Sequence, residues 1–470
     1  MKSRGKYLAK NTALFALNSI GTKLIVFLLV PLYTAAFDTS QYGTIDLVGT
    51  IVTIMVPIIT LNIGEAVMRF GLDKDSKTDD IMSVGLFWLA FSFIFSSLIV
   101  FVVSLFKSIQ VDLRLVYLYC VAQGMYQTFS CNLRGQEKLL HYAIGNILNT
   151  FSVAILNVLF LVVLHLGLPG YFLAYILAYF IASIYCFFAG DVTSTLKHFH
   201  LDKNLLKNMT KYSIVLVPNS LMWWIMNSSD HMMVSSMISI AANGIYAVSY
   251  KLPSILSVIS TIFNQAWSYS AIKENESKDR SEFNNAMFDN LIRVLALVTA
   301  FMLFVTRPLM SIYVSAQYYD AWKYMPYLLV GNFFLTLGTF LSTFYTVNKD
   351  SKGFLYSGSV GALLNVVLNF LLIPLMGIHG AALATCFSYM TVYIYRIIDT
   401  RKYMKVAVFR PVYILHYIMI VGCALTMLLP AMLGQILLFI ELLLVMIINY
   451  KFILGIVSSA LAIVKKKVKK

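Results

Sequence analysis

Long apolar stretches recur along the whole chain, and they constrain its fold more than any other feature. A helix that crosses about 30 Å of hydrocarbon needs roughly 20 apolar residues. We count fourteen such stretches, at 11–36, 43–70, 81–106, 113–133, 139–164, 168–190, 211–237, 243–271, 284–314, 321–347, 353–376, 378–399, 408–429 and 434–463. The sequence therefore predicts an all-α polytopic membrane protein with fourteen transmembrane helices.

The composition and the placement of charge agree with this prediction. Only 12% of the residues are charged and 59% are hydrophobic, whereas a soluble protein carries about 25% charged residues. With the N-terminus inside, 28 of the 36 basic residues fall in inner segments and 3 in outer ones. Because cytoplasmic loops are enriched in Lys and Arg, we expect both termini to be cytoplasmic. We therefore interpret the net charge of +15 as a consequence of this topology, reinforced by attraction to anionic membrane lipid. It indicates no nucleic-acid partner.

The loop lengths divide the chain into four parts. We predict an N-terminal six-helix lobe over 1–190, a cytoplasmic amphipathic linker over 191–210, and a C-terminal six-helix lobe over 211–400. Two peripheral helices and a basic tail follow over 401–470. The two lobes share a plan of a long helix, a short Gly-containing turn and a long Pro-containing helix, and an offset of 201 residues aligns Gly43 with Gly244.

No motif for catalysis or for a cofactor is present. The sequence contains no G-x-x-x-x-G-K-[ST] and no H-E-x-x-H, and its five cysteines form no C-x-x-C. His198 and His200 share one loop, where we interpret them as solvated residues. The predicted outer loops are too short to hold a sugar-processing site. We therefore expect no metal, no cofactor and no enzymatic activity.

Charged residues inside the predicted helices are the candidate site residues, because each costs roughly 2.5–3.5 kcal/mol at mid-membrane depth on insertion scales. Lys23 lies about midway along the first predicted helix, either as a hydrogen-bonded structural lysine or as a cation that lines a polar cavity. Lys251 and Arg293 are further candidate cations.

Four of the intramembrane charges also allow a structural interpretation. Asp230 and Lys251 lie at equal distances from the turn near 240–241, so an ion pair and a coupling role are both open. Glu65 and Arg69 are four residues apart on one predicted helix and can pair with each other. Prolines at 31, 57, 218, 253 and 308 fall in the helices that hold most of these charges, and broken helices around a midplane cavity are typical of alternating-access carriers.

Several segments resemble a known family of carriers. They run from Lys23 to Ala35, through QYGTIDLV (41–48) and GEAVMRFGLDKD (64–75), and again over ANGIYAVSYKLPSILSVISTIFNQAW (242–267) and IPLMGIHGAALAT (373–385). They resemble the Wzx-type polysaccharide-repeat-unit flippases of the MOP exporter superfamily. The resemblance implies a MATE-like V-shaped bundle of two six-helix lobes plus two extra helices.

The resemblance also implies an activity and its partners. The expected substrate is an undecaprenyl-pyrophosphate-linked oligosaccharide, moved across the bacterial cytoplasmic membrane for surface polysaccharide synthesis. The expected coupling ion is H⁺ or Na⁺, and the expected protein partners are the polymerase and glycosyltransferases of the same pathway. A diphosphate requires fixed positive charge in a polar cavity, for which Lys23, Lys251 and Arg293 are the candidates.

Three alternatives stay open. A lipid II flippase would also need internal cations. A MATE-type drug/cation antiporter shares the implied fold, although a cationic substrate would favour an acidic first helix, and this one carries Lys23. A membrane-embedded glycan polymerase or ligase would lengthen the glycan instead of moving the lipid.

Overall fold

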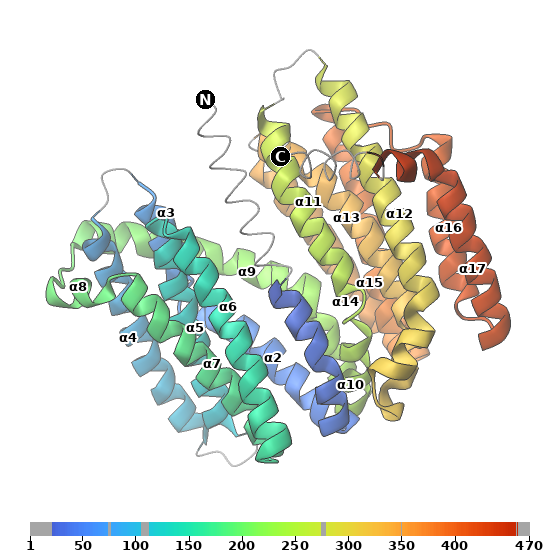
Figure 1. Cartoon of the computed structure of the whole chain (residues 1–470). Helices are drawn as coiled ribbons and strands as arrows, with labels where there is room; N and C mark the ends of the chain where they lie inside the picture. Colours follow the sequence, from blue (N-terminus) through green and yellow to red (C-terminus); the bar gives the residue numbers. More distant parts are fainter. Residues whose placement is uncertain are drawn as a thin grey trace, which may run out of the picture. The chain divides into compact units, whose positions relative to one another are not determined.

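The computed structural model describes residues 21–73, 77–104, 112–273, 279–348, 350–456 and 458, and every regular element among them is a helix. The chain divides between Gly244 and Ile245 into two compact units (Figure 1). The first unit holds the helix Gly21–Ala36, α2 (Thr39–Ile59), α3 (Ile63–Gly71), α4 (Thr78–Ser104), α5 (Leu113–Gly135), α6 (Leu139–Asn157), the π-helix η1 (Val158–Val163), α7 (Gly167–Ala189), α8 (Val192–Lys197), α9 (Lys203–Met237) and the first turn of α10 (Ile240–Ser249).

The second unit begins within α10. It continues with α11 (Ser254–Lys273), α12 (Arg280–Tyr313), the 3-10 helix η2 (Ala316–Lys323), α13 (Met325–Val347), α14 (Ser351–Met376), α15 (Ile378–Asp399), the 3-10 helix η3 (Thr400–Lys402), α16 (Pro411–Thr426) and α17 (Ala431–Ile448). Its core lies around α13, which packs against α11, α12 and α15. Within the most apolar stretch of α13, 83% of the residues are buried.

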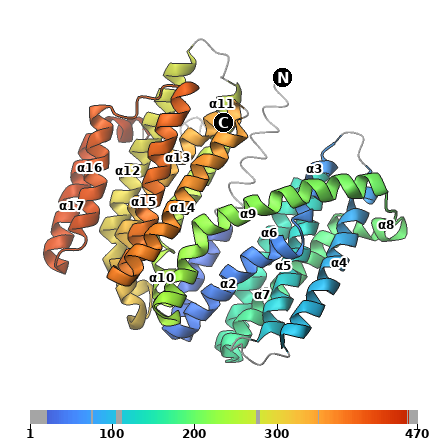
Figure 2. The same cartoon turned by 180° about the vertical axis from the view of Figure 1, so that it is seen from behind.

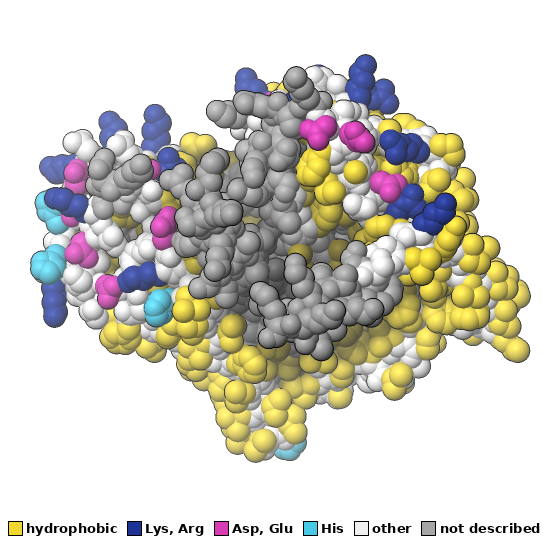
Figure 3. Space-filling view, turned by 45° about the horizontal axis from the view of Figure 1, so that its top comes forward, with side chains coloured by type: hydrophobic (Ala, Val, Ile, Leu, Met, Phe, Trp, Pro, Cys, Tyr) yellow, Lys and Arg dark blue, Asp and Glu magenta, His cyan; other side chains and the backbone are white. Residues whose placement is uncertain are grey.

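Apolar side chains cover the flanks of both units, and charged side chains gather near the ends of helices, for example around α8 (Figure 3). Leu375, Ile312 and Met432 are among the most exposed of these apolar side chains, at 79%, 84% and 80%. Such surfaces are stable in lipid and costly in water. The chain is therefore a helical multi-pass membrane protein.

The predicted number of fourteen spans is not confirmed. Within the described residues, nine helices are long and apolar enough to cross a membrane, or ten if the bent pair α10–α11 is one span. Gly21–Ala36 and α16 are apolar but shorter. A further two, α5 and α9, carry polar side chains along their length, which lowers their mean hydropathy. Each of the fourteen predicted ranges contains helix, and the count of fourteen spans stays a prediction.

Two of the predicted helices are broken. The range 43–70 divides into α2 and α3 at Thr60–Asn62, where Leu61 and Asn62 have positive φ. The range 243–271 divides into α10 and α11, which are bent by 48°. Pro57 and Pro253 stand at or just before these breaks. Proline lacks the N–H of a helical hydrogen bond and its ring displaces the preceding turn, so both breaks occur in helices whose prolines predict a break.

The predicted linker over 191–210 is mostly helical. It contains α8 and the first turns of α9, which begins at Lys203 with the Asp202 carboxylate accepting from the Asn204 and Leu205 N–H groups. The long helix α9 lies across α2 and α3 (Figure 2). The first unit therefore includes a helix that follows this linker, and whether the lobes divide at 191–210 stays a prediction.

Candidate polar cavity at the broken helix of the first unit

A polar cavity of about 430 Å³ lies inside the first unit, beside the break between α2 and α3. The break turns Glu65 of α3 toward the cavity, while α5, α6 and α7 supply the other walls. Amide, hydroxyl and charged side chains share the lining with apolar ones. The polar members are Thr53, Glu65, Gln123, Tyr126, Gln127, Ser130, Arg134, Tyr142, Asn146 and Tyr179.

A polar stripe on α5 builds one wall of this cavity. Gln123, Gln127, Ser130 and Arg134 follow one another at spacings of four, three and four residues, so they project from one side of the helix. Each of these groups would be costly to bury in lipid without a polar partner. The stripe therefore indicates a face of α5 that meets polar groups rather than lipid.

The charged groups of the cavity contact an aromatic ring and a thiol. The Arg134 guanidinium lies over the ring of Tyr142, 5.6 Å from its centroid. The Cys131 Sγ lies 3.9 Å from a carboxylate oxygen of Glu65. Within the part of the chain that the structure describes, neither Glu65 nor Arg134 forms an ion pair. A ligand in this cavity would meet one cation, one anion and several neutral donors and acceptors.

Arg69 has a different partner from the predicted Glu65. Arg69 donates to Asp73 at 2.7 Å, and both side chains are more than half exposed. One turn of helix separates Arg69 from Asp73 as it does from Glu65, but Glu65 turns inward to the cavity while Arg69 remains at the surface. Of the two residues, only Glu65 therefore lines the cavity.

The three predicted cavity cations lie in different surroundings. Lys23 is an exposed side chain in the described helix Gly21–Ala36. Lys251 lies in the break between α10 and α11 of the second unit. Arg293 of α12 donates to Asp289 at 2.8 Å and to Asn449 at 3.2 Å, so its charge is bound on the side of α12 that faces the C-terminal helices.

The predicted partners Asp230 and Lys251 belong to different units. Asp230 is buried in α9, with an exposed fraction of 3%, and one of its oxygens accepts from the N–H of His231 at 3.0 Å. Lys251 is partly buried. Whether the two pair with each other stays a prediction.

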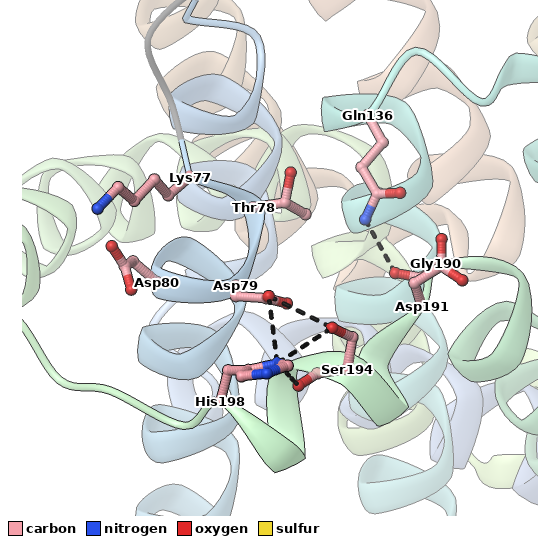
Figure 4. A pocket seen from close by; sticks show the side chains of 9 residues that line it. All are labelled: Lys77, Thr78, Asp79, Asp80, Gln136, Gly190, Asp191, Ser194 and His198. Carbon is pink, nitrogen blue, oxygen red and sulfur yellow. Dashed lines mark hydrogen bonds and ion pairs between the residues drawn. The ribbon is translucent and has the colours of Figure 1, made fainter.

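A second cavity, of about 740 Å³, lies between the start of α4 and the short helix α8 (Figure 4). Its polar side chains mostly bind one another. Asp79 accepts from Thr195 at 2.8 Å and from Ser194 at 3.4 Å, and His198 Nδ1 lies 4.0 Å from the same carboxylate. These contacts fasten α8 to α4, so we interpret this cavity as a structural joint. In the described residues, no cluster of His, Cys, Asp and Glu could hold a metal ion.

Two features of the first unit were missed in the sequence. The predicted helix over 113–133 leaves Arg134 outside, although the spacing of the polar stripe on α5 could have assigned it to a helix face. His231 and Asp46, which are not among the predicted site residues, form a pair across two helices at 2.7 Å. Nothing in the local sequence around Asp46 signals a partner 185 residues away.

Comparison with known proteins identifies the family. The family described as "Polysaccharide biosynthesis protein" matches residues 8–269, more than half of the chain. The chain belongs to the polysaccharide biosynthesis protein family. An uncharacterized membrane protein of Methanocaldococcus jannaschii is 24% identical over 291 residues, which cover 58% of this chain and 68% of that protein. The predicted membership is confirmed.

Solved structures give the same fold at low sequence identity. An inward-facing multidrug resistance MATE family transporter of the MOP superfamily matches with a TM-score of 0.67 and 11% identity, over 82% of this chain and 97% of that chain. The lipid II flippase MurJ, in an inward closed conformation, matches with a TM-score of 0.65 and 12% identity, over 96% and 100%. This polysaccharide biosynthesis family protein therefore has the predicted MATE-like fold.

Proposed function

We propose that this chain translocates undecaprenyl-pyrophosphate-linked oligosaccharide repeat units across the cytoplasmic membrane, and that it uses an ion gradient to do so. The observation that carries the proposal is the polar cavity of about 430 Å³ in an otherwise lipid-facing bundle, with Arg134 and Glu65 in its lining. A cavity of this volume lies within the usual range for small-molecule sites, roughly 300–1,000 Å³. Membership of the polysaccharide biosynthesis family supports the sugar class.

The chemistry of the cavity suits a sugar with a phosphate group. Guanidinium groups bind phosphate oxygens through two parallel hydrogen bonds, and Arg134 carries no ion pair within the described residues. Gln123, Gln127 and Asn146 offer both donors and acceptors for sugar hydroxyls. Arg134 also stands at the end of α5 next to a loop that the positive-inside rule assigns to the cytoplasm. We therefore infer that the substrate is loaded from the inner leaflet.

Only two of the three cations predicted from the sequence are substrate ligands in this proposal. Lys23 remains a proposed substrate ligand on the first helix, and Lys251 at the bend of α10–α11 remains a second one. Arg293 is not proposed as a ligand, because Asp289 and Asn449 already bind its guanidinium. Arg134 takes its place as the third cation.

The test is transport by the purified full-length protein in proteoliposomes. An isotope-labelled undecaprenyl-diphosphate oligosaccharide is placed in the outer leaflet, and its disappearance from an impermeant glycosidase is followed over time. We expect unchanged lipid to become protected only when the protein is present. A lengthened glycan would instead indicate a polymerase. Protection of lipid II alone, or uptake of a cationic dye alone, would overturn the proposal in favour of those substrates.

A further inference from the structure

A buried carboxylate–imidazole pair joins two helices of the first unit. Asp46 of α2 and His231 of α9 lie 2.7 Å apart between Oδ2 and Nδ1, and their side chains are only 16% and 9% exposed. Asp46 is seven residues from the start of α2 and His231 six from the end of α9, so each lies about 10 Å along its helix from that end, at 1.5 Å per residue. Buried ionisable residues in the helices of membrane proteins are rare and usually functional.

The pair sits at a tight junction of three helices. Asn243, in the first turn of α10, donates from Nδ2 to Asp46 at 3.1 Å and to the carbonyl oxygen of Gly43 at 3.3 Å. Gly43 and Gly244 pack backbone to backbone, since a Cβ on either would overlap a carbonyl oxygen of the opposite helix. Gly43 and Gly244 are also the two glycines that the 201-residue repeat aligns. Asp46 therefore holds α9 and α10 to α2 at the point where these helices approach most closely.

The hydrogen bond fixes which nitrogen of His231 exchanges a proton. An ionised carboxylate is only an acceptor, so Nδ1 carries a hydrogen and donates it to Asp46. The proton that comes and goes is then the one on Nε2. With this proton the pair is neutral as a whole, and without it the pair keeps one negative charge. In a buried site of low dielectric this change of one charge has a large energetic effect.

Other polar and ionisable groups lie around the Asp46–His231 pair. Asp230, adjacent to His231 on α9, is a second buried carboxylate. Tyr42 lies one turn before Asp46 on α2, and Tyr175 of α7 interacts with Tyr42. The first turn of α10 contributes Asn243, which cannot titrate. The described contacts of the pair thus come from a carboxylate, a phenol and an amide on α2, α9 and α10.

We propose that Asp46 and His231 form a proton-binding site, and that its occupancy couples a proton gradient to movement at the junction of α2, α9 and α10. The coupling rests on the proposed transport function, whereas the binding of the proton does not. The pair is distant in sequence from the cavity residues Glu65 and Arg134, and it links α2, which also lines the cavity at Thr53, to α9. Helix α2 thereby contributes to both the polar cavity and the proposed proton site.

The proton site is tested directly by ¹⁵N NMR of the full-length protein with labelled histidine, in nanodiscs, from pH 5 to 9. The His231 signal is assigned by its loss in His231→Gln. We expect His231 to hold its proton more tightly than the exposed His165. In Asp46→Asn its proton affinity should fall roughly ten- to a thousandfold, because an opposite charge at this distance shifts titration by that much. If His231 titrates together with His165, and does so equally in Asp46→Asn, the proposal is wrong.

His416 provides a matched control in the second unit. It is also fully buried, but its ring bonds to the carbonyl oxygen of Val412 and to the amide of Asn449 rather than to a carboxylate. His416→Gln should remove its own signal and leave the titration of His231 unchanged. A shift of the His231 titration in this variant would contradict the local origin of the effect.

The coupling is tested by the proteoliposome assay with and without a pH gradient. We expect a gradient to stimulate wild-type transport roughly fivefold or more, a common size for coupling between two sites. His231→Gln should still equilibrate the lipid without a gradient and should lose the stimulation, while His416→Gln should keep it. Retained stimulation in well-folded His231→Gln would overturn the coupling. If the wild type moves no lipid in either condition, the proposed function and the coupling both fail, and the NMR titration alone decides the proton site.

Discussion

The two units use buried charge in different ways. In the second unit, the Asp289 carboxylate binds Arg293, and the Ser357 hydroxyl and the Gly338 carbonyl bind Arg396. Each cation thus joins its helix to a neighbour or to its own next turn. A buried charge held in this way contributes to folding and is unavailable to a ligand.

In the first unit, some ionisable groups face a cavity or bind each other instead of a structural partner. Arg134 and Glu65 line a polar cavity, and neither forms an ion pair among the described residues. Asp46 and His231, two ionisable side chains, contact each other. From this comparison we propose that buried charges hold helices together in the second unit and act in transport in the first. The contrast is testable, because a change in the second unit should affect stability and one in the first should affect transport.

The largest expected effect is on stability, at the close contact between α2 and α10 in the first unit. Gly43→Ala places a Cβ into the carbonyl oxygen of Ile240, so α2 and α10 must move apart. Overpacking of this kind costs about 3 kcal/mol. The measurement is the melting temperature of the solubilised protein. Gly49→Ala is the control on the same helix, since nothing lies within 4 Å of its Cβ. Equal melting temperatures for the two variants would contradict the close contact.

The next effect concerns the structural arginine of the second unit. Arg396 is 3% exposed and donates to Ser357 at 3.0 Å and to the Gly338 carbonyl at 3.1 Å. Arg396→Met keeps the length of the side chain but leaves these acceptors unpaired, at a cost of about 2 kcal/mol. We expect a lower melting temperature and less protein in the membrane. The exposed Arg401 is the control, and a stable Arg396→Met would show that this charge does not hold α15 to its neighbours.

A loss of transport with unchanged stability should follow a change in the cavity of the first unit. Arg134→Gln removes a charge-assisted hydrogen bond to substrate, which is worth about 1.5–3 kcal/mol, or roughly a tenfold to hundredfold loss of transport. Protein level and melting temperature should remain those of the wild type. Lys138→Gln, four residues further on, removes an amine that pairs with Asp191 and should keep its transport rate. Normal transport by Arg134→Gln would exclude this arginine as a substrate ligand.

The smallest effect is expected at the surface of the first unit. Arg69 and Asp73 form an ion pair, but both side chains are more than half exposed, and such pairs contribute less than about 1 kcal/mol. The double variant Arg69→Ala with Asp73→Ala should match the wild type in melting temperature and in transport. A clear loss of transport in this double variant would return Arg69 to the site in which the sequence first placed it.

The sequence by itself determined the class of the protein and the course of its helices. Apolar runs of about 20 residues can be satisfied only in lipid, and a helix there is forced by the need to pair every backbone N–H and C=O group. These are local properties, so they could be derived from residues adjacent in the chain. Family membership also follows from sequence, through segments such as QYGTIDLV at 41–48 that the family match over residues 8–269 includes.

Only the tertiary structure decided which charges meet and which face a cavity. Helical periodicity shows that Gln123, Gln127 and Arg134 share one side of α5, but it does not show that Glu65 lies across from that side. The same limit applies to Arg293, which the sequence predicts as a cavity cation. Its carboxylate partner is one turn away, but its second partner, Asn449, lies 156 residues further on. A side chain's role depends on what covers its face of the helix, and that is set by packing between segments far apart in sequence.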